Sequence, residues 1–355
     1  MAQINKPSEY FNTVTYTGNG VSIGSGGNSI TGVNFQPDFV WIKRREIQHH
    51  RLFDVVRGAT KVIQSDLSDA EATNSEYLSS FDSDGFTVGN LAGVNANAGT
   101  YVAWNWLGGG TGVSNTDGSI TSTVSANTTS GFSIVTYTGN SSSSATVGHG
   151  LGVAPAMILN KCRTGANAGQ VFFIYHKGLS ANNMISFNTN AQAGTGSYSS
   201  GILSTSPTSD TFGFTAGSGG VINVNESSST YVSYCFAEKK GFSKFGSYTG
   251  NGSTDGTFIY TGFKPAFIIT KKTSATSNWH IYDNQRANPF NVVSGKLVAN
   301  TDEAEAVGAE CDFLSNGVKI RASGSDLNGS GASFIYMAFA SEPLVGTNNI
   351  PATAR

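Results

Sequence analysis

The chain has 355 residues, of which 12% are charged, and its formal net charge is −2. This weak charge excludes a broad electrostatic attraction to nucleic acid, and no apolar run approaches the roughly 20 residues that span a bilayer. Gly, Ser, Thr and Asn are abundant, yet 22 Phe, 13 Tyr and 4 Trp argue against disorder. We therefore expect an all-β chain, with no nucleic-acid partner and no membrane insertion.

The N-terminus and the cysteines bear on the compartment in which the chain folds. Residues 1–10 are polar and lack the apolar segment of a secretory signal. Cys162, Cys235 and Cys311 are odd in number and have no Cys-x-x-Cys spacing. We expect buried or half-buried free thiols and folding in a reducing cytoplasm.

The string Tyr-Thr-Gly-Asn occurs three times, beginning at Tyr16, Tyr137 and Tyr248. Each copy ends a short run of strand-forming residues, and Gly and Asn tolerate the positive φ of a tight turn. The copies lie about 110 to 120 residues apart, which is the usual size of a domain. The chain is therefore predicted to consist of three related units.

Behind each turn the same strand signals return in the same order. A proline leads an apolar run, a short strand follows, a polar or Gly turn feeds a further strand, and an aromatic strand closes the unit. In chain order these segments are 37–43, 51–54, 83–88 and 101–106; 155–161, 172–175, 211–215 and 231–236; and 265–271, 279–282, 315–320 and 334–339. Short strands at this spacing favour three tandem antiparallel β-sandwich units of the jelly-roll or concanavalin-like kind.

Composition also predicts where the units end. The expected boundaries are repeat 1 at 1–110, a Gly/Ser/Thr linker at 111–130, repeat 2 at 131–240, repeat 3 at 241–340 and a C-terminal arm at 341–355. Because the first join is long and the second is short, we expect units two and three to be closely coupled and unit one to be more independent. The arm either docks on a neighbour or is a loose tail.

The search for catalytic chemistry finds little. The Gly-rich stretches lack the residues of a phosphate loop, and no histidine spacing fits a metal site, so we expect no metal and no cofactor. Glu303 and Glu305 alternate as a glycosidase acid pair would on a strand, but Ala304 and Ala306 are poor strand formers. We expect no catalytic residue.

The basic residues have two interpretations. Lys43, Arg44 and Arg45 open the densest positive stretch, and Lys161 and Lys271 stand at the same offset from the unit's proline as Lys43. A lysine at a strand end usually stays in solvent and guards against edge pairing. The alternative is contact with an acidic partner surface or an anionic glycan.

The tryptophans can be sorted by the repeat. Trp41, Trp104 and Trp106 align mostly with apolar or aromatic residues of the other units and are predicted core. Trp279 aligns with the mixed pair His50 and Phe172. This position is the candidate for an exposed platform on which a sugar stacks.

Taken together, the unit resembles a repeat found in virion proteins of tailed phages, marine ones especially. The resemblance is carried by the Tyr-Thr-Gly-Asn turn, the proline-led strand and the closing aromatic strand. Residues 341–346 and 348–355 are similar to endings in that group. The resemblance covers most of the chain and implies lectin-like β-sandwich proteins on the particle surface, either tail fibres or head decorations, with no catalytic residues to carry over.

Three functions follow as expectations. The favoured one is a non-enzymatic virion structural protein of the tail-fibre or receptor-binding type, which leaves open a host-surface glycan as ligand. The alternative is a head-decoration protein, a cement or capsid fibre, that binds capsid subunits. The remote alternative is a carbohydrate-active enzyme that uses Glu303 and Glu305. The expected partners are other virion proteins and further copies of the chain, and the expected location is the virion, assembled in the host cytoplasm.

Overall fold

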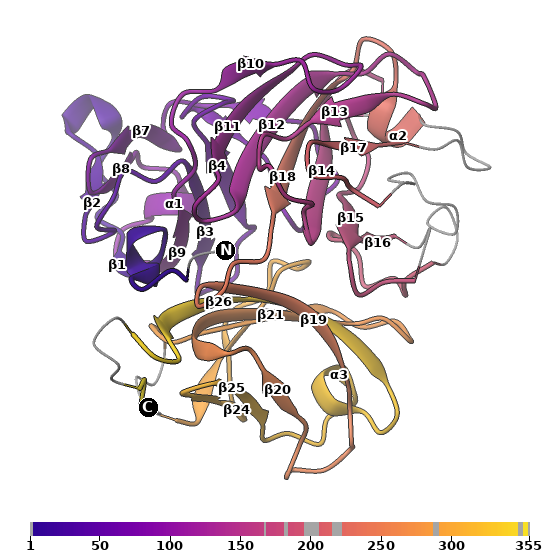
Figure 1. Cartoon of the computed structure of the whole chain (residues 1–355). Coiled ribbons are helices and arrows are strands. Elements are labelled where there is room, and N and C mark those ends of the chain that lie inside the picture. Colours follow the sequence, from indigo (N-terminus) through magenta and orange to yellow (C-terminus); the bar gives the residue numbers. More distant parts are fainter. Residues whose placement is uncertain are drawn as a thin grey trace.

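The computed structural model describes residues 3–166, 168–180, 184–194, 206–214, 222–286, 291–346 and 351–353 (Figure 1). The chain is mostly β, with several antiparallel sheets, as the composition predicted. Its helical segments are single turns: η1 (Pro7–Glu9), η2 (Ile23–Ser25), α1 (Ala92–Asn95), α2 (Ile222–Asn225) and α3 (Ser325–Asn328). Among the residues described, none of these helices has the length or hydrophobicity to cross a membrane.

Unit one comprises residues 3–110 and contains a four-stranded sheet, β1-β9-β3-β4, a three-stranded sheet, β2-β8-β7, and the pair β5-β6. The strands are β1 (Phe11–Thr17), β2 (Asn28–Ile30), β3 (Phe39–Arg44), β4 (Arg51–Asp54), β5 (Lys61–Val62), β6 (Ala72–Thr73), β7 (Leu78–Asp82), β8 (Gly85–Val88) and β9 (Thr100–Trp106).

Unit two comprises residues 111–240 and contains a seven-stranded sheet, β10-β11-β12-β18-β14-β15-β16, and the pair β13-β17. The strands are β10 (Val113–Asn115), β11 (Ser122–Asn127), β12 (Phe132–Thr138), β13 (Thr146–Gly148), β14 (Met157–Thr164), β15 (Phe173–His176), β16 (Ile185–Ser186), β17 (Thr211–Gly213) and β18 (Thr230–Phe236).

Unit three comprises residues 241–346 and contains one eight-stranded, nearly closed sheet in the order β19-β26-β21-β22-β23-β24-β25-β20. The strands are β19 (Ser243–Thr249), β20 (Phe258–Tyr260), β21 (Phe263–Lys272), β22 (Trp279–Asp283), β23 (Val293–Val298), β24 (Ala306–Leu314), β25 (Gly317–Ile320) and β26 (Ser333–Pro343).

All three units share one four-stranded order, in which the first strand pairs with the last, the last with the second and the second with the third. The orders are β1-β9-β3-β4, β12-β18-β14-β15 and β19-β26-β21-β22. The registers correspond as well: Tyr16 lies opposite Tyr101, Tyr137 opposite Tyr231, and Tyr248 opposite Phe334. In each pair the rings stack, with centroids 4.9, 5.0 and 4.7 Å apart.

The repeated turn motif attaches this sheet to the one-turn helix of its unit. The hydroxyls of Tyr16, Tyr137 and Tyr248 donate to carbonyls of α1, α2 and α3 at 2.8, 2.7 and 2.8 Å. The motif glycine is required by close approach, because a Cβ on Gly139 would lie 2.2 Å from the carbonyl oxygen of Glu226. Positive φ occurs two residues after that glycine, as at Gly20 and Gly252. The expected turn is confirmed, but the motif glycine serves contact and not conformational freedom.

The motif asparagine pairs with a second asparagine at the end of the helix. Asn140 Oδ1 accepts from Asn225 Nδ2, and Asn225 Oδ1 accepts from the backbone N–H of Asn140, both at 3.0 Å. The same reciprocal bonds join Asn19 to Asn95 and Asn251 to Asn328. Asn95, Asn225 and Asn328 are fully buried, so this pairing satisfies polar groups that would otherwise be costly to bury.

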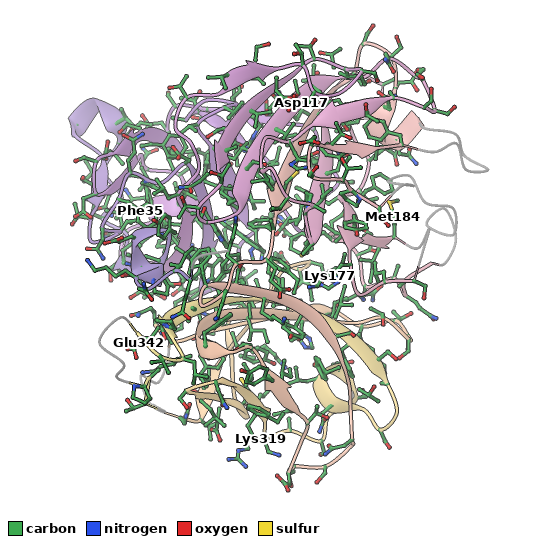
Figure 2. The ribbon with its side chains drawn as sticks, in the orientation of Figure 1. Phe35, Asp117, Lys177, Met184, Lys319 and Glu342 are labelled. Carbon is green, nitrogen blue, oxygen red and sulfur yellow. The ribbon has the colours of Figure 1, made fainter. Side chains whose placement is uncertain are left out.

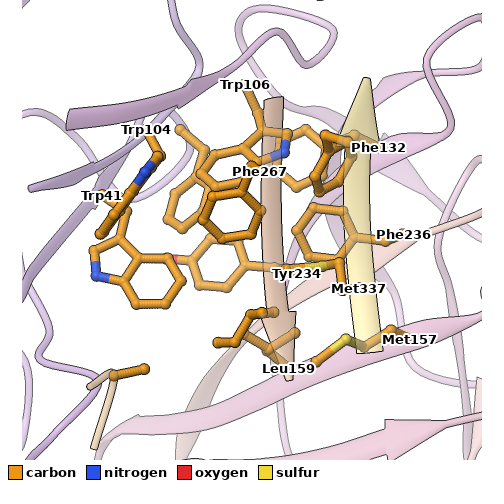
Figure 3. Packing of buried hydrophobic residues seen from close by; sticks show 14 of the residues in the cluster. Trp41, Trp104, Trp106, Phe132, Met157, Leu159, Tyr234, Phe236, Phe267 and Met337 are labelled. Carbon is orange, nitrogen blue, oxygen red and sulfur yellow. The ribbon is translucent and has the colours of Figure 1, made fainter. Parts of the chain in front are cut away.

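The units pack around a common centre, and each also has a core of its own. The shared cluster takes side chains from all three four-stranded sheets, including Trp41, Trp104 and Trp106, as the sequence predicted (Figure 3). It also takes Tyr234 and Phe236 from unit two and Phe267 and Met337 from unit three. The expectation that unit one is more independent is wrong, because its tryptophans lie in the centre of this cluster.

Two segments differ from their predicted form. The expected linker at 111–130 contains β10 and β11, which extend the sheet of unit two and bury Ile120 and Val124. The expected arm at 341–355 begins inside β26, which ends at Pro343. Its described part folds back on the chain, where Val345 bridges Pro351 and accepts a 2.6 Å hydrogen bond from Gln3. Cys162, Cys235 and Cys311 are free and buried, as expected.

Candidate functional site at the junctions between units

Three equivalent lysines reach from their own unit into the next one. Lys43 Nζ donates to the carbonyl of Asp302 at 3.4 Å, Lys161 Nζ to Ser68 at 2.6 Å, and Lys271 Nζ to Asn190 at 3.2 Å. Unit one thus contacts unit three, unit two contacts unit one, and unit three contacts unit two. The contacts close a ring, and we call the three contact regions junction 3–1, junction 1–2 and junction 2–3.

These lysines are not the solvated strand ends or partner contacts that the sequence suggested. Lys43, Lys161 and Lys271 are fully buried, and burial lowers the pKa of each ammonium to about 8. Each charge is retained because it donates to two or three carbonyls, and hydrogen bonds to a charged group contribute about 1.5–3 kcal/mol each. The neighbouring Arg44 and Arg45 also pair within the chain, with Glu46 at 2.7 Å and Glu305 at 2.7 Å.

The expected sugar platform is contradicted by burial. Trp279 is 1% exposed, and His50 and Phe172 are fully buried. Trp279 Nε1 donates to the carbonyl of Ser186 at 2.9 Å, and His50 Nε2 lies 3.0 Å from the carbonyl of Val298, so both rings are held across junctions. The alignment of the three positions was sound, because the residues have corresponding partners. Their backbone N–H groups donate to Asp66, Asn188 and Asn300.

Junction 1–2 and junction 3–1 each contain a buried ion-pair network, and the two networks are equivalent. At junction 1–2, Arg57 joins Asp54 to Glu71, and Arg163 of unit two binds the same Glu71 at 2.8 Å. Tyr234 of unit two donates its hydroxyl to Asp54 at 2.8 Å.

At junction 3–1 the corresponding residues make the corresponding contacts. Arg286 joins Asp283 to Glu305, and Arg45 of unit one binds Glu305 at 2.7 Å. Trp104 of unit one donates Nε1–H to Asp283 at 3.0 Å. The two networks therefore cross-link three units through two of the three junctions.

Among the residues that the structure describes, junction 2–3 lacks this network. The strand pairing places His176 where the other units have Asp54 and Asp283. The arginine stands three residues after the aspartate in the other units, and Leu179 holds that position here. Ala193 N–H bonds to the carbonyl of Thr273 as Glu71 N–H does to Arg163 and Glu305 N–H to Arg45, so Ala193 replaces the glutamate and Thr273 the second arginine. His176 keeps one link across the junction, through Nε2 to the carbonyl of Tyr336 at 3.0 Å. Burial lowers the pKa of His176 to about 4, so its imidazole is neutral.

Where the network is missing, the surface is hollowed. The cavity has a volume of about 390 Å³ and lies between the loop after β15 and the ends of β19 and β21 and the start of β26. Its lining residues are Gly178, Leu179, Ser180, Ala193, Ser247, Tyr248, Thr249, Thr273, Ser274, Ser333 and Phe334. The described residues of this lining bring hydroxyl groups and apolar surface but no carboxylate or ammonium. Such a site can exchange hydrogen bonds with a neutral, hydroxyl-rich ligand, but its lining offers no opposite charge to an ion.

The residues weighed for catalysis do not form an acid pair in the structure. Glu303 and Glu305 precede β24, so they do not alternate on a strand, and Glu305 is held between Arg45 and Arg286. The described residues contain no group of three or more His, Cys, Asp or Glu that could hold a metal ion. Sequence reasoning missed Ala193 and Thr273, although aligning them with Glu71 and Arg163 would have revealed the exchange.

The whole chain, apart from its ends, matches one protein family. The match covers residues 6–343 and therefore includes all three units and all three junctions. No curated protein and no solved structure matches the chain. The chain belongs to the family described as Domain of unknown function (DUF7483).

Proposed function

We propose that this protein is a non-enzymatic structural protein of a tailed-phage virion, displayed on the particle surface as a tail-fibre or receptor-binding component. In this proposal the hollow at junction 2–3 holds a neutral sugar of a host-surface glycan. One observation carries the site: two equivalent junctions are filled by charged side chains, whereas the third has a hydroxyl-lined cavity. Side chains that recur at equivalent junctions are explained by their role in the fold. The cavity at junction 2–3 does not recur, so we assign it to ligand binding.

The support for a virion role comes from the resemblance of the repeated motifs to those of tailed-phage virion proteins. The motifs that resemble phage virion repeats, such as the Tyr-Thr-Gly-Asn turn, are the ones that build each four-stranded sheet. Each unit is proposed to be a lectin-like sandwich of the jelly-roll or concanavalin-like kind. Association with further copies and with other virion proteins is part of the same proposal. Exposed loops on a rigid β scaffold are where attachment sites of this kind occur.

The sugar site is tested by filling it. The double variant Ala193→Glu with Thr273→Arg brings the charged pair of the other junctions into the cavity. Purified protein is applied to an array of neutral bacterial oligosaccharides, and wild type is expected to bind a subset that the double variant does not bind. The matched control is Val113→Glu with Thr116→Arg, which places the same residue types at exposed positions in and directly after β10. Binding that survives the filling, or no binding by wild type, contradicts the site.

The virion role is tested on particles. Mass spectrometry of purified virions is expected to detect the chain, and a map of the particle is expected to place it on the tail. Density on the capsid shell would instead support the head-decoration alternative, in which the protein binds capsid subunits. Absence from the particles overturns both. A carbohydrate-active enzyme would degrade the oligosaccharide that it binds.

A further inference from the structure

A second hollow lies at junction 2–3, at the other end of β19. It has a volume of about 600 Å³ and is formed by the residue after β15, the short join between units two and three, the start of β19 and the end of β20. Its lining residues are Lys177, Glu238, Lys239, Lys240, Gly241, Ser243, Lys244, Tyr260, Thr261 and Gly262. Lys177 lies where unit two meets unit three (Figure 2). Gly178, the next residue, lines the first hollow, so the two sites flank one loop.

This hollow is strongly positive in a chain that is nearly neutral. Its four lysines and one glutamate leave a formal charge of +3, against −2 for the whole chain. Glu238 is shared by Lys177 and by Lys244, whose ammonium lies 2.6 Å away. Lys240 is exposed, and the described contacts give its ammonium no ion pair. With Lys239 left aside, Lys177, Lys240 and Lys244 face the single carboxylate of Glu238, so positive charge exceeds negative charge in the hollow.

The fold does not require these charges, because the equivalent positions at the other junctions are uncharged. Lys177 follows the third strand of its unit, where the other units have Val55 and Asn284. Lys244 corresponds by register to Asn12 and Ser133. Comparing equivalent positions at the three junctions thus shows that both hollows contain residues that the other junctions lack.

An exposed aromatic ring completes the hollow. Tyr260 is 57% exposed and ends β20, while β19 supplies Lys244 on the opposite side. These two strands are the two ends of the nearly closed sheet of unit three, so the hollow lies beside the opening of that sheet. The tyrosine ring can stack on a sugar ring, and the neighbouring ammonium groups can bind a carboxylate of the same sugar.

We propose that this hollow is a subsite for a carboxylated sugar, such as a hexuronic acid residue of a polysaccharide. The carboxylate binds among Lys177, Lys240 and Lys244, and the sugar ring lies on Tyr260. An acidic peptide added as a strand is disfavoured, because β20 has only three residues with which to pair. The volume is that of a small-ligand site and not of a groove for an extended chain. The choice of a saccharide rests on the proposed attachment function.

The test is a calorimetric titration of the full chain with trigalacturonate, with the neutral trigalactoside as the matched ligand. Trigalacturonate is expected to bind, and raising the salt from 50 to 500 mM is expected to weaken it about fivefold or more, because exposed charges are screened. Lys240→Gln is expected to weaken binding about threefold and Tyr260→Ala about tenfold. The matched controls, Lys272→Gln and Phe258→Ala, alter a lysine and an exposed aromatic residue outside the hollow and are expected to leave the affinity unchanged.

Several results would overturn the subsite. These are no binding of trigalacturonate, equal binding of the neutral trigalactoside, or full affinity in both Lys240→Gln and Tyr260→Ala. Tighter binding of a poly-glutamate peptide than of trigalacturonate, lost in the same variants, would assign the hollow to an acidic protein instead. These readouts use purified protein, so a failure of the virion role, detected on particles, is distinguished from a failure of this site.

Discussion

Junction 1–2 and junction 2–3 occupy equivalent places in the ring but are held together differently. At junction 1–2, Arg57 is fully buried between two carboxylates and a tyrosine hydroxyl. At junction 2–3 the corresponding side chain is Leu179, and a neutral histidine makes a single hydrogen bond across the junction. Both junctions retain the buried lysine and the shared aromatic core. The ring therefore needs the lysine and the core at every junction but not the ion pairs.

Under the proposed function, the difference between the junctions also bears on ligand binding. Long charged side chains occupy the space at junction 1–2, whereas small and hydroxylated residues leave a cavity at junction 2–3. A buried ion-pair network adds little net stability compared with well-packed apolar residues, because desolvation offsets the attraction. One junction could therefore lose its network at small cost to stability and gain a surface that holds a ligand.

The largest effect is expected from breaking the network at junction 1–2 with a residue from junction 2–3. Arg57→Leu leaves Asp54 and Glu71 buried without their shared cation. Removing one partner of a buried pair costs about 3–5 kcal/mol of unfolding free energy. Urea unfolding followed by tryptophan fluorescence measures this loss, since all four tryptophans are buried.

The control is a complete exchange of the network. The variant Asp54→His, Arg57→Leu, Glu71→Ala and Arg163→Thr copies junction 2–3 into junction 1–2, so no buried charge is left unpaired, and Lys61, which loses Glu71, keeps an exposed side chain. It is expected to be more stable than Arg57→Leu alone. If the fourfold variant is the less stable of the two, the junctions are not equivalent and the comparison fails.

A smaller effect, about 3 kcal/mol, is expected from pH at His176. Its pKa is about 4 in the folded chain and about 6.5 when unfolded, so between these values the unfolded state binds a proton that the folded state does not. Its contribution is thus complete above pH 6.5, is lost as the pH falls toward 4, and changes no further below that.

The variant His176→Gln isolates this contribution, since the glutamine amide has the reach of Nε2 and can still donate to the carbonyl of Tyr336. The difference in unfolding free energy between pH 7 and pH 4 is expected to shrink by about 3 kcal/mol relative to wild type. The remaining difference reflects other buried histidines, such as His280, whose pKa is also lowered to about 4. An unchanged difference would mean that His176 is not buried as a neutral group at junction 2–3.

The sequence predicted the parts of the molecule that local pattern determines. Turn residues, proline-led strands and the core positions of Trp41, Trp104 and Trp106 recur at fixed offsets, so the repeat located them. The closure of the ring could not be read in this way. Lys161 looks like a solvated strand end until Ser68, 93 residues earlier, supplies its acceptor. The partner of Lys43 is 259 residues away.

The candidate site was missed for a related reason. Reactive residue types can be recognised in a sequence. The hollow at junction 2–3 instead arises because large charged side chains are absent from it. Ala193 and Thr273 carry no chemical signal alone, and they become informative only beside Glu71 and Arg163 at equivalent positions. The sequence predicted a platform at Trp279 because its position is chemically mixed among the units. In the structure, His50 bonds to Val298 and Trp279 to Ser186, so these two residues have different partners across their junctions.

The smallest expected effect sharpens the comparison inside unit three. Tyr101 and Tyr231 accept hydrogen bonds from the backbone N–H groups of Ala96 and Glu226 at 2.7 and 2.9 Å, whereas the equivalent residue of unit three is Phe334, which lines the hollow. Phe334→Tyr offers the same acceptor to Gly329 and is expected to raise the unfolding free energy by about 1 kcal/mol.

Urea unfolding of Phe334→Tyr measures this gain, and Phe313→Tyr is the comparison variant, because Phe313 is buried in the core of the same unit without an equivalent tyrosine in the repeat. That comparison variant is expected to lose stability, since a buried hydroxyl without a partner costs about 1–3 kcal/mol. A loss in Phe334→Tyr as large as in Phe313→Tyr would show that unit three has lost the helix geometry of the other units. A gain would mean that unit three keeps that geometry although it has phenylalanine at this position. Under the proposed function, the apolar surface of Phe334 then serves the hollow and not the fold.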